Sequence, residues 1–203
     1  AQQLFRHGCL LRVMREGKWV SGVVCHPQGR MVMFDIVGVK DADVQLMRQG
    51  ATSTLRYATA HWANQQGYEA VNFMGTWPWL EGGDFRHKRQ WGGTVCVPRE
   101  LYRRIWIRVR RITPAVSQFL KENPVIVLDE QGGLHGLIVV DDPHAVSDET
   151  RDKWKKRYIT PGLGSLLVRA VSSFAPETGD ASVPNLVIPI PNQGLQTDDA
   201  IGP

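Results

Sequence analysis

Long apolar runs and cysteines are both scarce in this sequence of 203 residues. No uninterrupted apolar run exceeds about six residues, and a helix needs roughly 20 to cross a bilayer, so the sequence predicts no membrane span. The three cysteines, Cys9, Cys25 and Cys96, are too few and too odd in number for a disulfide framework. The first residues do not resemble a signal peptide. We therefore expect a cytoplasmic protein.

Charge is distributed unevenly along the chain. The net charge is +4, and 42% of the residues are hydrophobic, as in a globular protein. Between Arg86 and Arg111, nine Lys or Arg residues face a single acid, Glu100, which makes that segment +8 and the remainder −4. A segment of such positive charge attracts anions, so the sequence predicts an anionic partner.

The first half of the chain alternates between strand and turn signals. Short runs rich in Val, Met and Ile, separated by Gly- and Pro-containing turns, predict antiparallel strands at residues 10–14, 20–25 and 31–37. A helix is expected over residues 51–66, where apolar side chains recur on one face and Gly67 supplies the stop. A strand over residues 68–74 and a short helix near residues 84–91 should follow.

The second half predicts further short elements. Strands are expected at residues 94–97 and 102–112, and a hairpin at residues 125–128 and 134–140. Helices are expected at residues 115–122, 147–158 and 163–174. From residue 175 onward the chain has five Pro and no aromatic residue, which is typical of a tail that packs no core.

These elements predict an α/β fold with a mixed, mainly antiparallel sheet and flanking helices. The composition shift at Thr113 and Pro114 divides it into residues 1–112, a small α/β extension over residues 113–174, and a Pro- and Gly-rich tail over residues 175–203. The chain lacks an initiator Met and begins close to a strand, so we expect the fold to be incomplete at its N-terminus.

Three segments carry a resemblance to a known family: RQGATSTL at residues 48–55, ANQQGY at residues 63–68, and above all DFRHKRQWGG at residues 84–93. In order and content they resemble the C-terminal half of a GNAT-type acyltransferase domain, nearest to the Fem-like branch of peptidoglycan cross-bridge aminoacyltransferases and their acetyltransferase-like relatives. The resemblance implies transfer of an acyl or aminoacyl group to an amine acceptor. It also implies that the first part of the fold is missing from this sequence.

The resemblance and the chemistry of acyl transfer together suggest candidate residues. Lys88 matches the family's lysine at the acyl ester, where a positioned cation stabilises the oxyanion; a solvated surface lysine is the alternative. For the general base, Asp35 and Asp84 are the candidates, together with Glu69, and each could equally be a cap or an ion-pair partner. Water or the substrate could also supply the base.

The start of the helix at residue 51 is the predicted binding site for an anionic group. Unpaired N–H groups and the positive end of the helix dipole favour an anion there. The candidate cofactor-binding residues are Arg48, Gly50, Ala51, Thr52 and Ser53, although an ordinary capped helix would look the same. Because this segment lacks the usual acyl-CoA spacing of the superfamily, the donor stays open between acyl-CoA and aminoacyl-tRNA, and no metal is expected.

Aromatic and basic residues suggest where substrate would bind. Trp77, Trp79 and Trp91, with Arg86, could wall an acceptor pocket, or the tryptophans could belong to the core. Along the strand at residues 102–112, one face carries the candidates Arg104, Trp106, Arg108 and Arg110. That face could hold coenzyme A, tRNA or a nucleotide-linked substrate, or it could be a charged edge strand.

Other functions remain as alternatives or find no support. The alternative to a transferase is a non-catalytic binding module, either a degenerate transferase half or a nucleic-acid binder that uses the basic strand. Asp141, Asp142 and His144, with His135, match no metal-ligand spacing. Around Ser165 the sequence LGSLL lacks the Gly-x-Ser-x-Gly elbow, so the sequence offers no support for a serine hydrolase.

Overall fold

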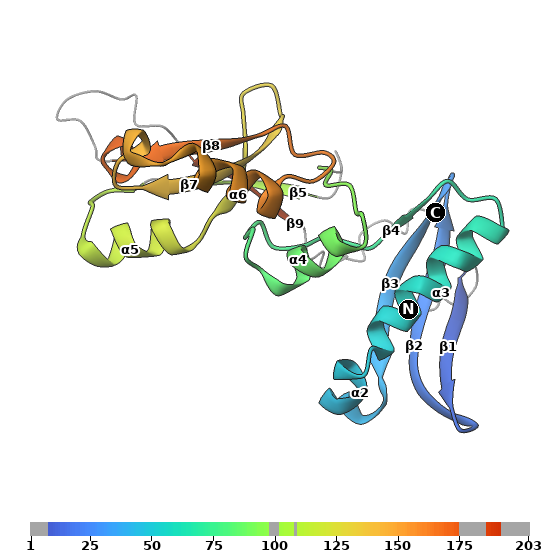
Figure 1. Cartoon of the computed structure of the whole chain (residues 1–203). Coiled ribbons are helices and arrows are strands. Elements are labelled where there is room, and N and C mark those ends of the chain that lie inside the picture. The colour runs from blue at the N-terminus through green and yellow to red at the C-terminus, as the bar shows by residue number, and fades with distance from the viewer. Residues whose placement is uncertain (1–7, 98–101, 108, 175–185, 192–203) are drawn as a thin grey trace, which may run out of the picture. The chain divides into compact units, whose positions relative to one another are not determined.

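The computed structural model describes residues 8–97, 102–107, 109–174 and 186–191 (Figure 1). Contacts divide the chain between Gly75 and Thr76 into two compact units. The boundaries expected at residues 112 and 174 both lie inside the second unit. Each unit combines helices with a sheet that has both antiparallel and parallel pairs, so the predicted α/β class with mixed sheets is confirmed.

The first unit begins with three antiparallel strands, as the sequence predicts. They are β1 (Cys9–Arg15), β2 (Lys18–Gln28) and β3 (Met31–Val39). The turn between β1 and β2 places Glu16 and Gly17 at positive φ, and Gly29 has φ 58° in the next turn. Glycine adopts this region without a steric penalty, which favours turns at Gly17 and Gly29.

A helical crossover then returns the chain to the same sheet. It consists of the 3₁₀ turn η1 (Lys40–Ala42), α2 (Val44–Arg48) and α3 (Ala51–Gln65), and it leads to β4 (Ala70–Asn72). The expected helix is confirmed to within a residue, whereas the expected strand over 68–74 is only three residues long. Strand β4 pairs with β3 in parallel. Leu55 and Ala63 of α3 are buried against the sheet in one apolar cluster with Val23, Val32 and Phe34.

The second unit is built on the sheet β6-β7-β8. Strands β6 (Val125–Leu128) and β7 (Leu134–Val140) form the predicted hairpin, and β8 (Ser165–Ala170) pairs with β7 in parallel after the helix α6 (Asp148–Tyr158). Alternate residues of β6 enter two different apolar clusters, one containing Ile126 and Leu128 and the other Val125 and Val127. This sheet is therefore buried on both faces.

Further elements surround that sheet. They are α4 (Gly83–Gln90), β5 (Tyr102–Ile107), α5 (Pro114–Glu122), η2 (Pro143–Ala145), η3 (Val171–Phe174) and β9 (Leu186–Pro191). Phe85 of α4 and Tyr158 of α6 are buried in the same cluster as Ile126. Thr113 caps α5 by accepting a hydrogen bond from the Val116 N–H, and Pro114 follows at the first helical position, where proline costs no hydrogen bond.

Three expectations for the second unit are wrong in whole or in part. Residues 163–174 form β8 and η3 instead of a helix, because Leu166 packs on one cluster and Leu167 on the other, as in a strand buried on both faces. Residues 94–97 form no strand. The tail packs in part, since β9 pairs with β5, while residues 175–185 and 192–203 lie outside the described residues.

Within the described ranges, no helix is both long enough and apolar enough to cross a membrane.

Candidate functional site

Asp35 in the first unit occupies a break in the β2–β3 ladder. Val24 pairs with Ile36 and Cys25 pairs with Phe34, so Asp35 is the extra residue of a β-bulge. A bulge re-aims a side chain and often lies beside a functional site. The Asp35 side chain is 14% exposed, and its Oδ2 contacts Nδ1 of His26 on β2. The sequence singled out Asp35, whereas it gave His26 no partner.

The parallel ladder between β3 and β4 ends close to this bulge. Pairing runs from Met31 with Ala70 to Met33 with Asn72, although β3 itself continues to Val39. Asp35 therefore lies two residues beyond the last paired position of β3. The His26–Asp35 pair is thus fixed next to the point where β3 stops pairing with β4.

The predicted anion-binding residues lie together at the junction of α2 and α3. Gly50 precedes α3 with φ 93°, a conformation that favours glycine, and its carbonyl accepts from both the N–H and the hydroxyl of Thr54. Arg48 is exposed at the end of α2, Ala51 is buried, and Thr52 and Ser53 are half-buried. The structure brings the group together on consecutive turns, as its sequence proximity requires.

Lys88 and Asp84, two of the predicted catalytic residues, pair with each other on α4. Lys88 Nζ lies 2.8 Å from Asp84 Oδ2, and the lysine side chain is 15% exposed. With the acid in the first turn and the base four residues later, the pair also complements the helix dipole. Both belong to the second unit, whereas the start of α3 belongs to the first.

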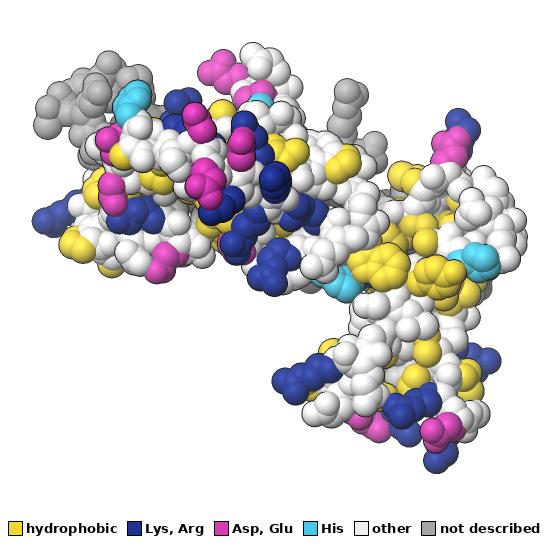
Figure 2. All heavy atoms as spheres, viewed as in Figure 1, with side chains coloured by type: hydrophobic (Ala, Val, Ile, Leu, Met, Phe, Trp, Pro, Cys, Tyr) yellow, Lys and Arg dark blue, Asp and Glu magenta, His cyan; other side chains and the backbone are white. Residues whose placement is uncertain are grey.

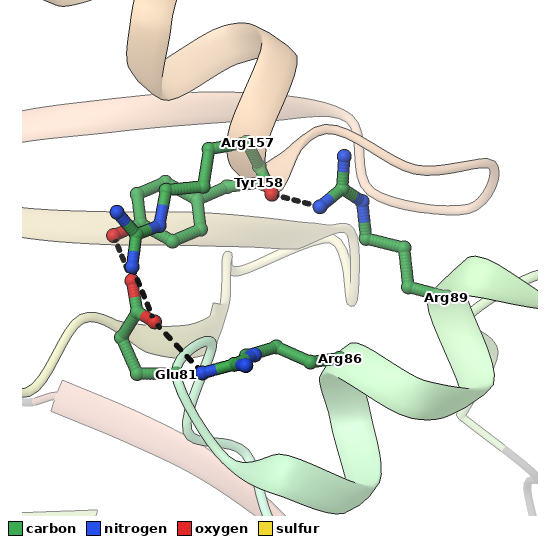
Figure 3. A network of polar contacts seen from close by, with 5 residues as sticks. All are labelled: Glu81, Arg86, Arg89, Arg157 and Tyr158. Carbon is green, nitrogen blue, oxygen red and sulfur yellow. Dashed lines mark hydrogen bonds and ion pairs between the residues drawn. The ribbon is translucent and has the colours of Figure 1, made fainter.

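A network of polar contacts joins α4 to the C-terminal end of α6 (Figure 3). Glu81 accepts hydrogen bonds from Arg157, at 2.8 Å, and from the Tyr158 hydroxyl, and Arg86 lies 4.0 Å from the same carboxylate. Arg89 donates to the main-chain carbonyls of residues 156 and 157. These contacts hold the face of α4 that carries Arg86 and Arg89 against α6.

The two acids of this network have shifted pKa values. Burial acts to raise the pKa of Glu81, but hydrogen bonds from Arg157 and Tyr158 outweigh it and leave the pKa below its ordinary value. Burial and the hydrogen bond to Glu81 raise the pKa of Tyr158 to about 12. At neutral pH, Glu81 is therefore ionised and Tyr158 carries its proton.

Lys and Arg side chains gather over α4 and α6 on the face shown in Figure 2. The C-terminal half of α6 contributes Lys153, Lys155, Lys156 and Arg157. Some of this charge is balanced locally, because Lys153 pairs with Glu149 at 2.8 Å and Lys155 with Asp152 at 3.2 Å. Arg86 and Arg157 likewise contact Glu81. We call residues 153–157 together with Arg86 and Arg89 the basic surface.

The predicted substrate-binding aromatic residues are in different environments. Trp79 packs against the cluster of Val125 and is edge-on to Phe119, with ring centroids 5.8 Å apart. Trp77 and Trp91 are exposed. Trp79 thus has the core role that the sequence left open, while Trp77 and Trp91 are accessible to a ligand.

The remaining predictions concern the basic strand and the third candidate base. Arg104 and Trp106 occupy alternate positions of β5. The structure does not describe the side chains of residues 102–107, and it does not describe residue 108. Arg110 is exposed. Glu69 forms an ion pair with Arg30. In the ranges that the structure describes, there is no group of at least three His, Cys, Asp or Glu residues that could hold a metal ion.

The structure also brings together three polar residues that spacing did not connect. Asp129, His135 and Ser165 are linked by hydrogen bonds at one end of the strands of the β6-β7-β8 sheet. The sequence considered His135 only as a metal ligand and Ser165 only within a missing motif. A parallel pairing between β7 and β8, which no local pattern encodes, joins them.

Comparisons with protein-family models, curated proteins and solved structures find no match to this chain.

Proposed function

We propose that this chain transfers an acyl or aminoacyl group to an amine, with the reaction centred on the His26–Asp35 pair. The observation that carries the proposal is the bulge at Asp35, two residues past the end of the β3–β4 ladder. A bulged strand beside an ending ladder offers backbone groups and a re-aimed carboxylate to a ligand.

The connectivity of the first unit supports this proposal. Three antiparallel strands, a Gly-containing connection, a helix and a parallel fourth strand follow one another in the order expected for half of a GNAT-type domain. The proposal thus agrees with the family resemblance of residues 48–55 and 63–68, which occupy the start and end of that helix.

The chemistry requires a base because an amine at neutral pH is mostly protonated. In the neutral tautomer of His26 whose Nδ1–H donates to the Asp35 carboxylate, Nε2 has a lone pair. The amine nitrogen attacks the carbonyl carbon of a thioester or ester donor, its proton passes to His26 Nε2, and the bond to sulfur or oxygen breaks. The leaving group then takes up a proton, and the amide is the product.

Two further groups have proposed roles in binding the donor. The first-turn N–H groups of α3, next to Arg48, would hold the phosphates of coenzyme A or of a tRNA terminus. The basic surface would attract the same polyanionic donor over a longer range.

The test is product formation by the purified chain. Acetyl-CoA and an aminoacyl-tRNA are each incubated with a panel of amines, and N-acylated product is measured by mass spectrometry. His26→Gln should lower kcat/KM by about 10² to 10⁴, the usual contribution of a general base. His61→Gln is the matched control, because this exposed histidine of α3 stacks on Tyr57.

Two results would contradict the proposal. If the folded chain forms no N-acylated amine from either donor, the proposed transfer is wrong. If it does form product, but His26→Gln is as active as His61→Gln, the reaction does not depend on the His26–Asp35 pair.

A further inference from the structure

A hydrogen-bonded chain of a serine, a histidine and an aspartate lies at one end of the strands of the β6-β7-β8 sheet. Asp129 follows β6 directly, His135 is the second residue of β7, and Ser165 is the first residue of β8. His135 and Ser165 are register partners in the parallel β7–β8 ladder. Two residues that are 30 positions apart are thereby held side by side on two rigid strands.

The distances define one proton arrangement. His135 Nε2 lies 2.9 Å from Asp129 Oδ2, and His135 Nδ1 lies 2.9 Å from Ser165 Oγ. An ionised carboxylate can only accept, so Nε2 carries the ring proton of the neutral imidazole. Nδ1 is then a lone-pair acceptor, and the Ser165 hydroxyl donates to it. Ser165, His135 and Asp129 thus follow the order of a nucleophile, its general base and the acid that orients the base.

Asp129 is fixed in the role that this arrangement needs. Hydrogen bonds from His135 and from the Gly133 N–H, the latter at 2.6 Å to Oδ1, keep the pKa of Asp129 below its ordinary value. The Asp129 N–H donates in turn to the Gly133 carbonyl. The carboxylate is therefore ionised at neutral pH and is held on both sides by the turn.

Two glycines leave room for these side chains. A Cβ atom at Gly133 would lie 2.6 Å from Asp129 Oδ2, and one at Gly164 would lie 3.3 Å from His135 Cε1. Contacts this close would displace the carboxylate or crowd the ring. Glycine at positions 133 and 164 thus avoids side chains that would disturb the hydrogen bonds among the three residues.

The three residues are also accessible, and the serine is not needed to close the turn. The side chains of His135 and Asp129 are 20% and 33% exposed, and Ser165 is half-buried next to the exposed Gly164. The turn between β6 and β7 is already closed by the bonds between Asp129 and Gly133. The hydroxyl of Ser165 is therefore not required to close the β6–β7 turn, and it is placed where it could act as a nucleophile.

We propose that Ser165 is a nucleophile that accepts an acyl group from an activated ester, with His135 as its general base and Asp129 as the residue that orients His135. Ser165 Oγ attacks the carbonyl carbon while its proton passes to His135 Nδ1. The bond between the carbonyl carbon and the leaving alkoxide breaks, and the alkoxide takes the proton from His135. Water then releases the acyl group as a carboxylic acid by the same route, and Ser165 is regenerated.

This activity is independent of the amine acylation proposed for the first unit, because it uses no amine and no residue of that unit. The Gly164 N–H donates to the Leu134 carbonyl and is not available to an oxyanion. A single-turnover probe that reports the nucleophile directly is therefore a better readout than ester hydrolysis.

The experiment labels the full chain with an alkyl fluorophosphonate, which forms a bond from serine oxygen to phosphorus and releases fluoride. Intact mass and peptide mapping should show one adduct, at Ser165. Ser165→Ala should abolish the adduct, and His135→Gln and Asp129→Asn should each slow its formation at least about tenfold. Ser173→Ala is the matched control, since that exposed serine of η3 donates to the Ala170 carbonyl at the end of β8, and the substitution should leave labelling unchanged.

Three outcomes would overturn the proposal: a folded wild-type chain with no adduct, an adduct at another residue, or an adduct at Ser165 that forms equally fast in both His135→Gln and Asp129→Asn. Thermal unfolding of each variant shows that it is folded. If His135→Gln does not fold, Asp129→Asn and the wild-type chain still decide the question.

Discussion

Cys9 of β1 lies directly opposite Cys25 of β2 in the antiparallel ladder. Both thiols belong to the cluster covered by α3, and the Cys25 sulfur also lies 3.6 Å from the Thr59 hydroxyl. Burial raises the pKa of Cys25 to about 11 and raises that of Cys9 as well. The two thiols are therefore mainly protonated at neutral pH, and a protonated thiol is a poor nucleophile.

The three cysteines should react with iodoacetamide in a fixed order. At pH 8 we expect Cys96, which is exposed, to be alkylated first, then Cys9, and Cys25 last. Peptide mapping over a time course measures the order. In urea the differences should disappear, and alkylation of Cys25 as fast as Cys96 in the folded chain would contradict the burial of that thiol.

Lys88 is the lysine that the family resemblance assigns to acyl transfer, so Lys88→Met should reduce the rate of acyl transfer in a variant that is still folded. The substitution removes the ammonium but keeps an apolar chain of similar length, and loss of one oxyanion donor costs about 3 kcal/mol, or roughly a hundredfold in rate. Lys121→Met is the control, since Lys121 also pairs with a carboxylate, that of Asp141 at 3.1 Å, and lies outside the basic surface. Equal turnover in the two variants, measured with the product assay, would remove Lys88 from the mechanism.

The contact between Tyr158 and Glu81 should make the fold sensitive to alkaline pH. A raised folded pKa means that this contribution to stability is complete below the ordinary tyrosine value of 10.0 and is lost as pH rises toward about 12. Urea midpoints between pH 8 and pH 12 should therefore fall more steeply for the wild type than for Tyr158→Phe. Parallel profiles would show that this phenol does not titrate differently in the folded state.

The basic surface should bind polyanions in a salt-dependent manner. Lys153→Gln combined with Lys156→Gln should weaken binding of a tRNA and reduce the magnitude of the log–log salt slope by about two, one for each lost phosphate contact. The control pair, Lys18→Gln with Lys40→Gln, removes the same charge from exposed positions of the first unit. Fluorescence anisotropy at several salt concentrations measures both, and equal losses would mean that only net charge matters.

Local chemistry made much of the fold predictable. The turns at Gly17 and Gly29 and the hairpin of β6 and β7 follow from residues that favour turns between runs of apolar residues. Helix α3 follows from its apolar periodicity. Asp35 was a candidate because it is a carboxylate on a strand, but its bulge and its contact with His26 depend on a register that no neighbouring residue encodes.

The sequence by itself determined where strands, turns and most helices lie, because those depend on neighbours within a few residues. Only the tertiary structure decided that residues 163–174 leave the helical state, since burial on both faces of a parallel pair with β7 outweighs a helical pattern of leucines. The same pairing brings Ser165 to His135. Contacts between distant strands are set by the packing of the whole sheet, so the residues that they join cannot be inferred from spacing alone.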